Sequence, residues 1–476
     1  MMEAKSVLIA LLDDGIDLNR CPNICLQDDL IVDPDGNIRP RRESEIIYTD
    51  HGTTCARIIH QYAPDAEFCS LTIFTSQTLR TTPGQLRAAL NWCFENNIPL
   101  IHLSAGTTQL CDQEYIRRLI ARMIQQGQTI VAARSNDFGR YTVPACCAGV
   151  LGVAVDPLLI SDQFYIRDAV PNDVQIFSSS RHDLSGYPWR KTETAISNSY
   201  AAPNITAKIH ALLSNAWNSV PQLYRSLAGR PISTARMGPD FLSSALVFDP
   251  QHFLAVPELL MFRIVKTISN EAELLAAAEQ EKYTSIVLIP PCPVTKGFWS
   301  ELFHRSENRA GIVYAGEAVE HYCQDAPCLF WDEGARRRLI MQMSALQDDI
   351  ETPVVWIEPF ESVSLRLLCK LRDRLTDEGY GCIAVTDYPR AYLYGLEYLP
   401  EGFHSEPLIT QLCHTHCPDI VLCSFSHAAL KAPRELQISF GPYDSVRLNE
   451  GAATISVPKR LSDNEVEEIV QLFLES

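Results

Sequence analysis

Residues 98–136 read IPLIHLSAGTTQLCDQEYIRRLIARMIQQGQTIVAARSN, a stretch that decides the fold. The apolar runs at its two ends, IPLIHL and TIVAA, are typical of buried strands. Between them one apolar stripe recurs at helical spacing, formed by Ile116, Leu119, Ile120, Met123 and Ile124. Gly127 is a natural end for that helix, because glycine adopts the left-handed conformation of a helix C-terminus without strain. A strand, a crossover helix and a second strand predict two parallel neighbours in one sheet.

The same alternation continues on both sides of this stretch. Strands are predicted in SVLIALLDDG (6–15), DAEFCSLTIF (65–74) and GVLGVAV (149–155), and a helix in QLRAALNWCFENN (85–97). The prediction is an α/β fold with a doubly wound parallel sheet that helices cover on both faces. In such sheets, active residues gather beyond the carboxyl ends of the strands.

After about Leu227 the α/β pattern restarts. Short apolar strands and one acidic helix occupy 240–345, and further strands and helices occupy 350–476. We therefore expect three domains, at 1–227, 240–345 and 350–476. Residues 436–458, LQISFGPYDSVRLNEGAATISVP, are interpreted as an antiparallel edge pair. Ser462 and Glu465 have the spacing of a capping box at the start of the last helix.

Bulk composition limits the class of protein. The chain has 476 residues, 46% of them hydrophobic, and a net charge of −18, which is unfavourable for binding nucleic acid or an anionic membrane. Its 16 cysteines are irregularly spaced in apolar contexts such as EFCSLTIF, which favours buried reduced thiols. The N-terminus does not resemble a signal peptide, and no apolar run reaches about 18 residues. We expect a cytoplasmic protein.

Three short motifs have ordinary structural interpretations. DPDGN (33–37) is most simply a tight turn, with a calcium loop as the alternative. CHTHC (413–417) has its cysteines at helical spacing, which favours core packing over zinc. The strand–loop–helix VVWIEPFESVSLRLL (354–368) is placed like a degenerate P-loop, but it lacks the glycines and lysine, and Glu358 and Glu361 would repel phosphate. We therefore predict no cofactor and no metal.

Four polar residues stand where strands end or helices begin. They are Asp13, His51, Asn136 and Ser199. A nucleophilic serine needs a base, an acid that orients the base, and a donor for the oxyanion, and this set supplies all of them. Ser199 lies in SNSYAAPNITAKIHALL (197–213), just ahead of a helix whose first turn would contain Pro203. On this segment alone, an N-terminal capping role is the alternative to nucleophile.

The segments around these residues resemble the subtilisin-like serine proteases (peptidase family S8). LLDDGID, HGTTCA, VAARSNDFG and SNSYAAP resemble the family's Asp, His, oxyanion and Ser motifs, in the family's order. The resemblance covers roughly residues 5–215. It implies an Asp13–His51–Ser199 catalytic triad, with Asn136 in the oxyanion hole.

The resemblance also implies a substrate site. LIHLSAG resembles the strand that pairs with the substrate backbone, at Ser104, Ala105 and Gly106, and Asp137 would lie at the rim of the pocket for the side chain before the cleaved bond. A carboxylate there favours a basic residue. A segment that would act as a propeptide is not expected, in agreement with an intracellular protease.

Two departures from the family's pattern leave an alternative open. Ser197-Asn198 replaces the usual Gly-Thr before the nucleophile, and Ser135 replaces a glycine before the oxyanion asparagine. Asn198 would offer a substitute oxyanion donor. These changes point to a slow or narrowly specific enzyme, or to an inactive peptide-binding scaffold that keeps the fold.

The second half weakly resembles accessory proteins of clostridial-type peptide maturation systems. The resemblance implies an enzyme that removes the leader from a ribosomally made precursor peptide, with the second half as a recognition or partner-binding region. The expected partners are a peptide or protein substrate, a maturation complex or a second copy of the chain, and neither nucleic acid nor membrane.

Overall fold

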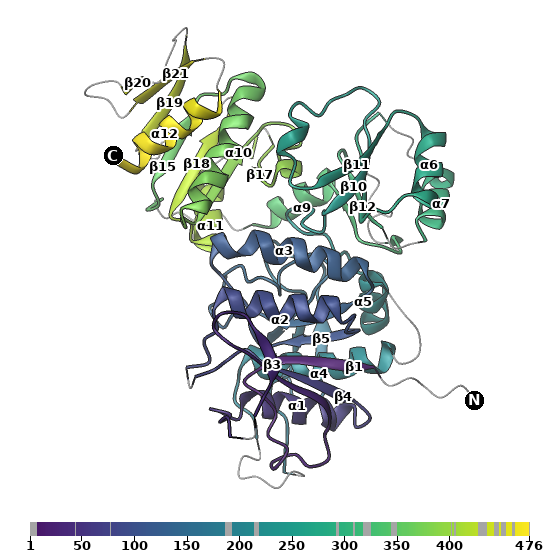
Figure 1. The fold of residues 1–476 in the computed structure, drawn as a ribbon. Helices are drawn as coiled ribbons and strands as arrows, with labels where there is room; N and C mark the ends of the chain where they lie inside the picture. The colour runs from purple at the N-terminus through teal and green to yellow at the C-terminus, as the bar shows by residue number, and fades with distance from the viewer. Residues whose placement is uncertain are drawn as a thin grey trace.

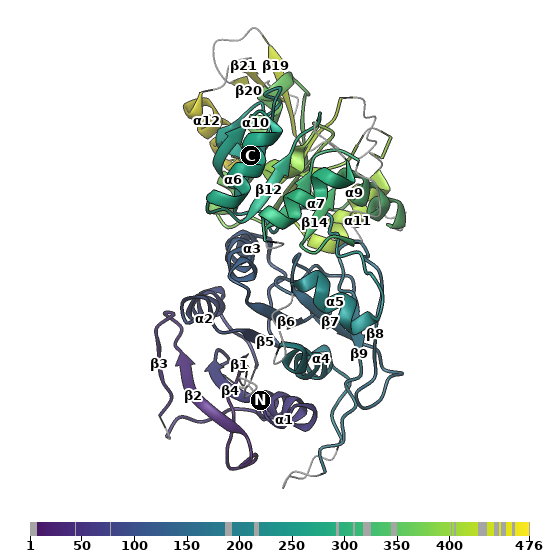
Figure 2. The same ribbon diagram turned by 90° about the vertical axis from the view of Figure 1, so that its right-hand side faces the viewer.

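The computed structural model describes residues 7–42, 44–76, 78–185, 193–213, 219–291, 295–307, 310–317, 325–343, 350–400, 402–403, 406–426, 436–441, 447–448, 454–458 and 462–475. Three sheets with mainly parallel strands follow one another along the chain, each covered by helices (Figures 1 and 2). The predicted α/β class is confirmed.

The first sheet has the strand order β3-β2-β4-β1-β5-β6-β7-β9-β8. Its strands are β1 (Leu8–Asp13), β2 (Cys25–Val32), β3 (Ile38–Pro40), β4 (Glu67–Thr72), β5 (Leu100–Leu103), β6 (Thr129–Ala133), β7 (Leu151–Val155), β8 (Phe164–Ile166) and β9 (Ile176–Ser178). All neighbours are parallel except β2–β3 and β8–β9 at the two edges. The five strands β1, β4, β5, β6 and β7 lie where the sequence predicts them.

Helices cover both faces of this sheet. They are α1 (His51–Tyr62), α2 (Pro83–Glu95), α3 (Leu110–Gln125), α4 (Asn198–Leu213) and α5 (Val220–Ala228). Strand β1 shows the division of the core, since Ala10 and Leu12 pack with α2 and α3, whereas Ile9 and Leu11 pack with α1, α4 and α5. Alternating side chains point to opposite faces of a strand, so the sheet is doubly wound as predicted.

Four strands of the first sheet are absent from the sequence prediction. These are β2, β3, β8 and β9, and most of the residues of β2 are at least partly exposed. The turn predicted in DPDGN joins β2 to β3, where the Gly36 N–H donates to the Asp33 carbonyl at 2.9 Å. Gly36 has a φ of +85°, a conformation that suits glycine.

The second and third sheets are built from the remaining elements. The second sheet has the strand order β11-β10-β12-β13-β14. Its strands are β10 (Ser244–Phe248), β11 (Arg263–Ile268), β12 (Ser285–Leu288), β13 (Gly311–Tyr314) and β14 (Phe330–Asp332). Its helices are η1 (Pro257–Leu259), α6 (Glu271–Gln280), α7 (Lys296–Arg305) and α9 (Glu333–Gln342). The third sheet has the strand order β17-β16-β18-β15-β19-β21-β20. Its strands are β15 (Val354–Ile357), β16 (Cys382–Thr386), β17 (Glu397–Tyr398), β18 (Ile420–Ser424), β19 (Leu436–Gly441), β20 (Arg447–Leu448) and β21 (Thr454–Pro458). Its helices are α10 (Glu361–Asp377), η2 (Ala391–Tyr394), α11 (Glu406–His416) and α12 (Asp463–Glu475).

The antiparallel edge pair predicted over 436–458 is wrong in its main part. Strands β19 and β21 are parallel neighbours, and only the two-residue β20 runs antiparallel, outside β21. Because β20 turns back before β21 begins, β21 runs in the direction of β19. The buried Ile455 and Val457 of β21 extend the core that β19 begins, which explains why β21 rather than β20 lies beside β19. The capping box at Ser462 and Glu465 is confirmed.

The three sheets are joined by direct contacts. A single apolar cluster includes residues of both the second and third sheets, among them Val247 and Val355. Helix α3 lies between the first sheet and these two later parts (Figure 1). The Tyr141 N–H of the first part donates to the Thr415 carbonyl of the third at 3.1 Å.

Two predictions from composition have structural outcomes. Every cysteine that the structure describes is unpaired, and most are buried, Cys69 and Cys423 among them, as predicted. Across the described part of the chain, no helix combines the length and the apolar character needed to span a bilayer.

Candidate active site

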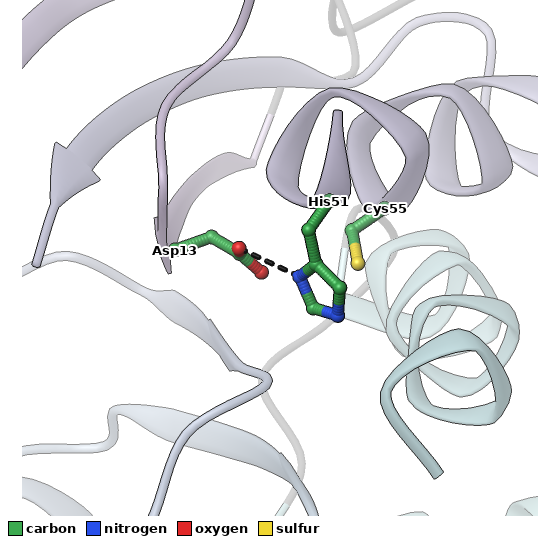
Figure 3. A group of neighbouring side chains, drawn as sticks. All are labelled: Asp13, His51 and Cys55. Carbon is green, nitrogen blue, oxygen red and sulfur yellow. Dashed lines mark hydrogen bonds and ion pairs between the residues drawn. The ribbon is translucent and has the colours of Figure 1, made fainter. Parts of the chain in front are cut away.

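Asp13 and His51 form a close pair at the carboxyl edge of the first sheet. Asp13 is the last residue of β1 and is fully buried, and His51 is the first residue of α1. His51 Nδ1 lies 2.7 Å from Asp13 Oδ1 (Figure 3). Burial alone would lower the pKa of His51, but the charge and hydrogen bond of Asp13 outweigh it, so the pKa is raised above its usual value. The pair has the geometry of a base held by an acid.

The start of α1 fits tightly against the end of β1. A Cβ at Gly52 would lie 2.7 Å from the Gly15 carbonyl oxygen and 2.9 Å from the Asp13 Cβ, so only glycine fits there. The Gly52 N–H donates to Asp14 Oδ1 at 2.7 Å, and Thr49 Oγ1 donates to Asp14 Oδ2. Asp14 is therefore a fixed anchor for the N-terminus of α1.

From the sequence, Asp14 and Asp17 are expected to be solvated loop acids beside the Asp13 motif, and for Asp14 this expectation is wrong. Asp14 is 1% exposed, and burial, followed by the charge of Asp13, raises its pKa. The reason is local, because its carboxylate accepts the Gly52 N–H at the start of α1 and so must lie inside. Asp17 is partly exposed and pairs with Arg20 at 3.1 Å, closer to the expected surface role.

Ser199 is the second residue of α4, so it lies in the first turn of the helix and not ahead of it. The Ser199 N–H donates to Ser197 Oγ at 3.3 Å, so the capping serine is Ser197 and not Ser199. The sequence placed Pro203 in the first turn, but Pro203 is inside the helix because α4 starts at Asn198.

Pro203 has a specific consequence for Ser199. Without an N–H, it cannot donate to the carbonyl four residues earlier, which is that of Ser199. Cys55 Sγ lies 3.6 Å from this carbonyl and supplies a donor instead. Cys55 is one turn after His51 on α1, and the Tyr200 ring centroid lies 5.2 Å from that of His51. These contacts bring the backbone of Ser199 against α1, one turn from His51.

Asn136 and Asn198 connect the loop after β6 with the start of α4. The Asn198 N–H donates to Asn136 Oδ1 at 3.3 Å, which leaves the Asn136 amide NH₂ as the end that can donate elsewhere. Asn198 is buried, its Oδ1 accepts from the Val155 N–H at 2.7 Å, and its Nδ2 donates to the Ser135 carbonyl at 2.8 Å. Its side chain joins three segments, so the expectation that it offers a substitute oxyanion donor is not supported.

The predicted substrate strand continues from β5. Ser104 is partly buried, Ala105 is buried and Gly106 is exposed. A Cβ at Gly106 would lie 2.8 Å from the Val143 carbonyl oxygen, so glycine is required where this segment passes Val143. Thr107 and Val143 pair through both backbone hydrogen bonds, at 2.8 and 2.9 Å.

His102 is a residue of this region that sequence reasoning missed. It is fully buried on β5, its Nδ1 lies 2.7 Å from Thr206 Oγ1 on α4, and its Nε2 lies 3.2 Å from Ser104 Oγ. Burial lowers the pKa of His102 to about 4, so it is neutral and links β5 with α4. In the sequence, the only sign of this buried link is a histidine within the otherwise apolar run LIHL (100–103).

Two further groups bear on specificity and metal binding. Asp137 is exposed, and its N–H donates to Ser135 Oγ at 3.1 Å. Among the described residues, one group has ligand atoms close enough for a metal, Asp13, His51 and Cys55, all within 4.8 Å of one another (Figure 3). Burial and the charge of Asp13 raise the pKa of the Cys55 thiol well above its usual value, which opposes the thiolate that a metal requires.

The CHTHC motif has a split outcome. Helix α11 ends at His416, so Cys417 lies beyond the helix and is exposed, whereas Cys413 is partly buried and packs at the edge of an apolar cluster. Core packing is thus correct for Cys413 and wrong for Cys417. The backbone of this motif contacts the loop that follows Asn136.

Comparison with known proteins finds remote structural similarity. No family profile matches the chain, and no curated protein matches it. Similar solved structures include the protease domain of PatA (20% identity, 45% of this chain and 82% of that chain, TM-score 0.33). A lanthipeptide protease gives 15% identity over 48% of this chain and 82% of its own, with a TM-score of 0.37. The epidermin leader peptide processing serine protease EpiP from Staphylococcus aureus gives 14% identity over 44% and 65%, with a TM-score of 0.33. At these scores the functional interpretation depends on the residues themselves.

Proposed function

We propose that the chain is a serine endopeptidase of the subtilisin-like type, with Asp13, His51 and Ser199 as its triad. The observation that carries the proposal is the 2.7 Å contact between His51 Nδ1 and the fully buried Asp13, next to the α4 turn that contains Ser199. An acid of this kind fixes the tautomer of the imidazole and leaves Nε2 as the base.

In this mechanism, Ser199 Oγ attacks the peptide carbonyl carbon while His51 Nε2 takes its proton. The negative charge that develops on the carbonyl oxygen is held by the Asn136 Nδ2 and the Ser199 N–H. His51 then returns the proton to the leaving amine, and a water molecule releases the acyl group by the same steps in reverse order. Asp13 stays ionised throughout and stabilises the imidazolium.

The substrate is proposed to be an extended peptide. It would pair with Ser104, Ala105 and Gly106, and Asp137 at the rim would favour a basic residue before the cleaved bond. A peptide-library profile without a basic preference would remove Asp137 from this role. The finer proposal is leader removal from a ribosomally made precursor peptide in the cytoplasm, with the later residues as recognition or partner-binding region.

A second candidate function is an inactive peptide-binding scaffold. The observation that favours it is Ser197, whose hydroxyl already accepts the Ser199 N–H that an oxyanion needs. In this second function, the segment Ser104, Ala105 and Gly106 would bind a peptide that is not cleaved.

A fluorophosphonate probe separates these functions. The intact chain is expected to be labelled at Ser199, and Ser199→Ala is expected to lose both labelling and peptide cleavage while its melting temperature stays the same. Ser243→Ala, one residue before β10, is the control and should label normally. An intact chain that is folded and unlabelled would leave the scaffold as the function.

A further inference from the structure

Two pockets that share part of their lining lie where the three sheet-containing parts meet. The smaller, which we call the inner chamber, has a volume of about 70 Å³, and the larger, which we call the outer chamber, has about 620 Å³. Both are lined by Arg117, Met261, Gly395, Glu397 and His416. These residues come from α3 and from both later parts of the chain. One water needs roughly 10–15 Å³ of such space, so the inner chamber has room for several waters or a small anion.

The inner chamber is lined by more cationic than acidic side chains. Arg117, Arg236 and Arg336 face two acids, Asp240 and Glu397. Glu397 is already paired, because its Oε2 accepts from the almost fully buried Arg336 at 2.9 Å. Asp240 accepts from the Ala148 N–H at 3.0 Å and from the Tyr141 hydroxyl at 3.4 Å.

Arg117 and Arg236 have neutral partners. Arg117 donates to Gln113 Oε1 at 2.8 Å and lies over the Tyr141 ring, and Arg236 donates to Gln175 Oε1 at 2.8 Å. Within the described ranges, neither arginine has a carboxylate at ion-pair distance, and the Nε of each is buried without a hydrogen-bond partner. Asp240, the acid of this chamber that has no ion pair, interacts electrostatically with both arginines, so the three arginines of the lining exceed its two acids by one charge. Excess positive charge in a buried lining is unfavourable unless an anion balances it, so this lining fits an anion.

His416 supplies an independent observation. It is 6% exposed, and neither of its ring nitrogens has a hydrogen-bond partner among the residues that the structure describes. It lines both chambers, with its ring centroid 5.1 Å from that of Tyr141. Buried polar groups are nearly always hydrogen-bonded, so a ring with two unpartnered nitrogens at a cavity is suited to bind a ligand there.

We propose that the inner chamber binds the carboxylate or phosphate group of a small organic anion, between Arg117, Arg236 and His416. The two guanidinium groups supply the charge, and the neutral imidazole donates one hydrogen bond. The rest of the ligand occupies the outer chamber. Since residues of all three parts line the cavity, the bound anion would also hold the later parts of the chain against α3.

Thermal unfolding of the full chain tests this site, with inorganic phosphate and succinate as separate probes and potassium chloride at matched ionic strength. A saturable rise in melting temperature is expected with at least one probe, and the probe that acts identifies the chemistry. Arg117→Gln should weaken the apparent affinity about tenfold or more, as expected for a lost charged hydrogen bond. Arg305→Gln, on α7 and outside the lining of both chambers, is the control and should keep the parental affinity for the probe.

A second measurement covers the case that Arg117→Gln does not fold. His416→Gln changes the same chamber without removing a charge, and crystals grown with selenate give a direct readout by anomalous scattering. Selenium density between Arg117 and His416, together with the thermal effect, supports the proposal. Water alone in the inner chamber at saturating selenate, or equal stabilisation of the parent and the chamber variants, would overturn it.

Discussion

At the scale of single residues, the pairing of Asp13 with His51 determines when the site can act. His51 accepts a proton only when it is neutral, so activity should rise with pH as His51 loses its proton. Burial lowers the pKa of His51, but Asp13 raises it further, so the net pKa lies above 6.5. The acidic limb of kcat/KM against pH is therefore expected to have its midpoint above 6.5.

The control for this pH profile is a direct titration of His51. In Ser199→Ala, the NMR signal of the His51 ring should titrate above 6.5, and adding Asp13→Asn should move that titration to lower pH because the charge is gone. A titration that Asp13→Asn leaves unmoved would show that Asp13 does not set the ionisation of His51.

Ser197 stands where the subtilisin-like proteases usually have glycine, and its hydroxyl leads to a prediction about kcat. Its hydroxyl accepts from the Ser199 N–H at 3.3 Å, so an oxyanion must displace that hydrogen bond. Ser197→Gly should raise kcat roughly fivefold, the equivalent of one hydrogen bond of about 1 kcal/mol. Stability should fall by only a few tenths of a kcal/mol, because glycine is an acceptable N-cap.

Ser197→Ala serves as the matched comparison, since it also lacks the hydroxyl but is a poor cap. It should share the gain in kcat and lose about 1 kcal/mol of stability, measured by denaturant unfolding. If kcat is unchanged or lower in both variants, the Ser197 hydroxyl does not compete with the oxyanion.

The residue scale also shows what the sequence could not predict. Asp13 at a strand end and His51 at a helix start are expected at one edge of a parallel sheet, and the two side chains lie in contact there. The role of Asp14 depends on the Gly52 N–H, 38 residues away, and that of Cys55 on the Ser199 carbonyl, 144 residues away. Neither contact leaves a local pattern in the chain.

At the scale of elements, burial decides which strands could be predicted. The strands found from sequence are continuous apolar runs, as in β5, where all residues are buried. Strand β2 has a mixed, largely exposed pattern because it lies near the edge of its sheet, and the three-residue β3, β8 and β9 are too short to show a period.

The junction of β1 with α1 gives a test at this scale. Gly52→Ala would place a Cβ 2.7 Å from the Gly15 carbonyl oxygen, so α1 must move away from β1 and take His51 with it. We expect the free energy of unfolding to fall by roughly 1–3 kcal/mol, the usual range for overpacking. We also expect kcat to fall by a larger factor than KM rises. Denaturant unfolding and steady-state kinetics measure the two effects.

Gly84→Ala is the control for that substitution. Gly84 lies on α2, where a Cβ would meet no atom closer than 3.7 Å, so stability and activity should be retained. Parental kinetics in Gly52→Ala would mean that the close approach of α1 to β1 does not position His51.

At the scale of the whole molecule, the later part of the chain contacts the loop that follows Asn136. Arg140 Nη1 donates to the His414 carbonyl at 3.4 Å, and the Tyr141 N–H donates to the Thr415 carbonyl at 3.1 Å. One residue on, Thr142 Oγ1 accepts from the Ser135 N–H at 3.1 Å, next to Asn136. The end of α11 is thus connected to the loop that contains Asn136, the proposed oxyanion donor, through three consecutive residues.

These contacts change what is expected of residues 1–227 alone. A fragment ending near Leu227 contains all the candidate catalytic residues, so the sequence alone predicts that it still cleaves a short, unstructured peptide. The loop after Asn136 loses its partners in that fragment, so we expect kcat on a short peptide to fall, since misplacing an oxyanion donor costs catalysis rather than binding. Active-site titration with a fluorophosphonate gives the concentration of correctly folded fragment, and kcat is calculated from that concentration. A corrected kcat equal to that of the intact chain would show that α11 does not support the loop, and would leave recognition as the role of the later residues.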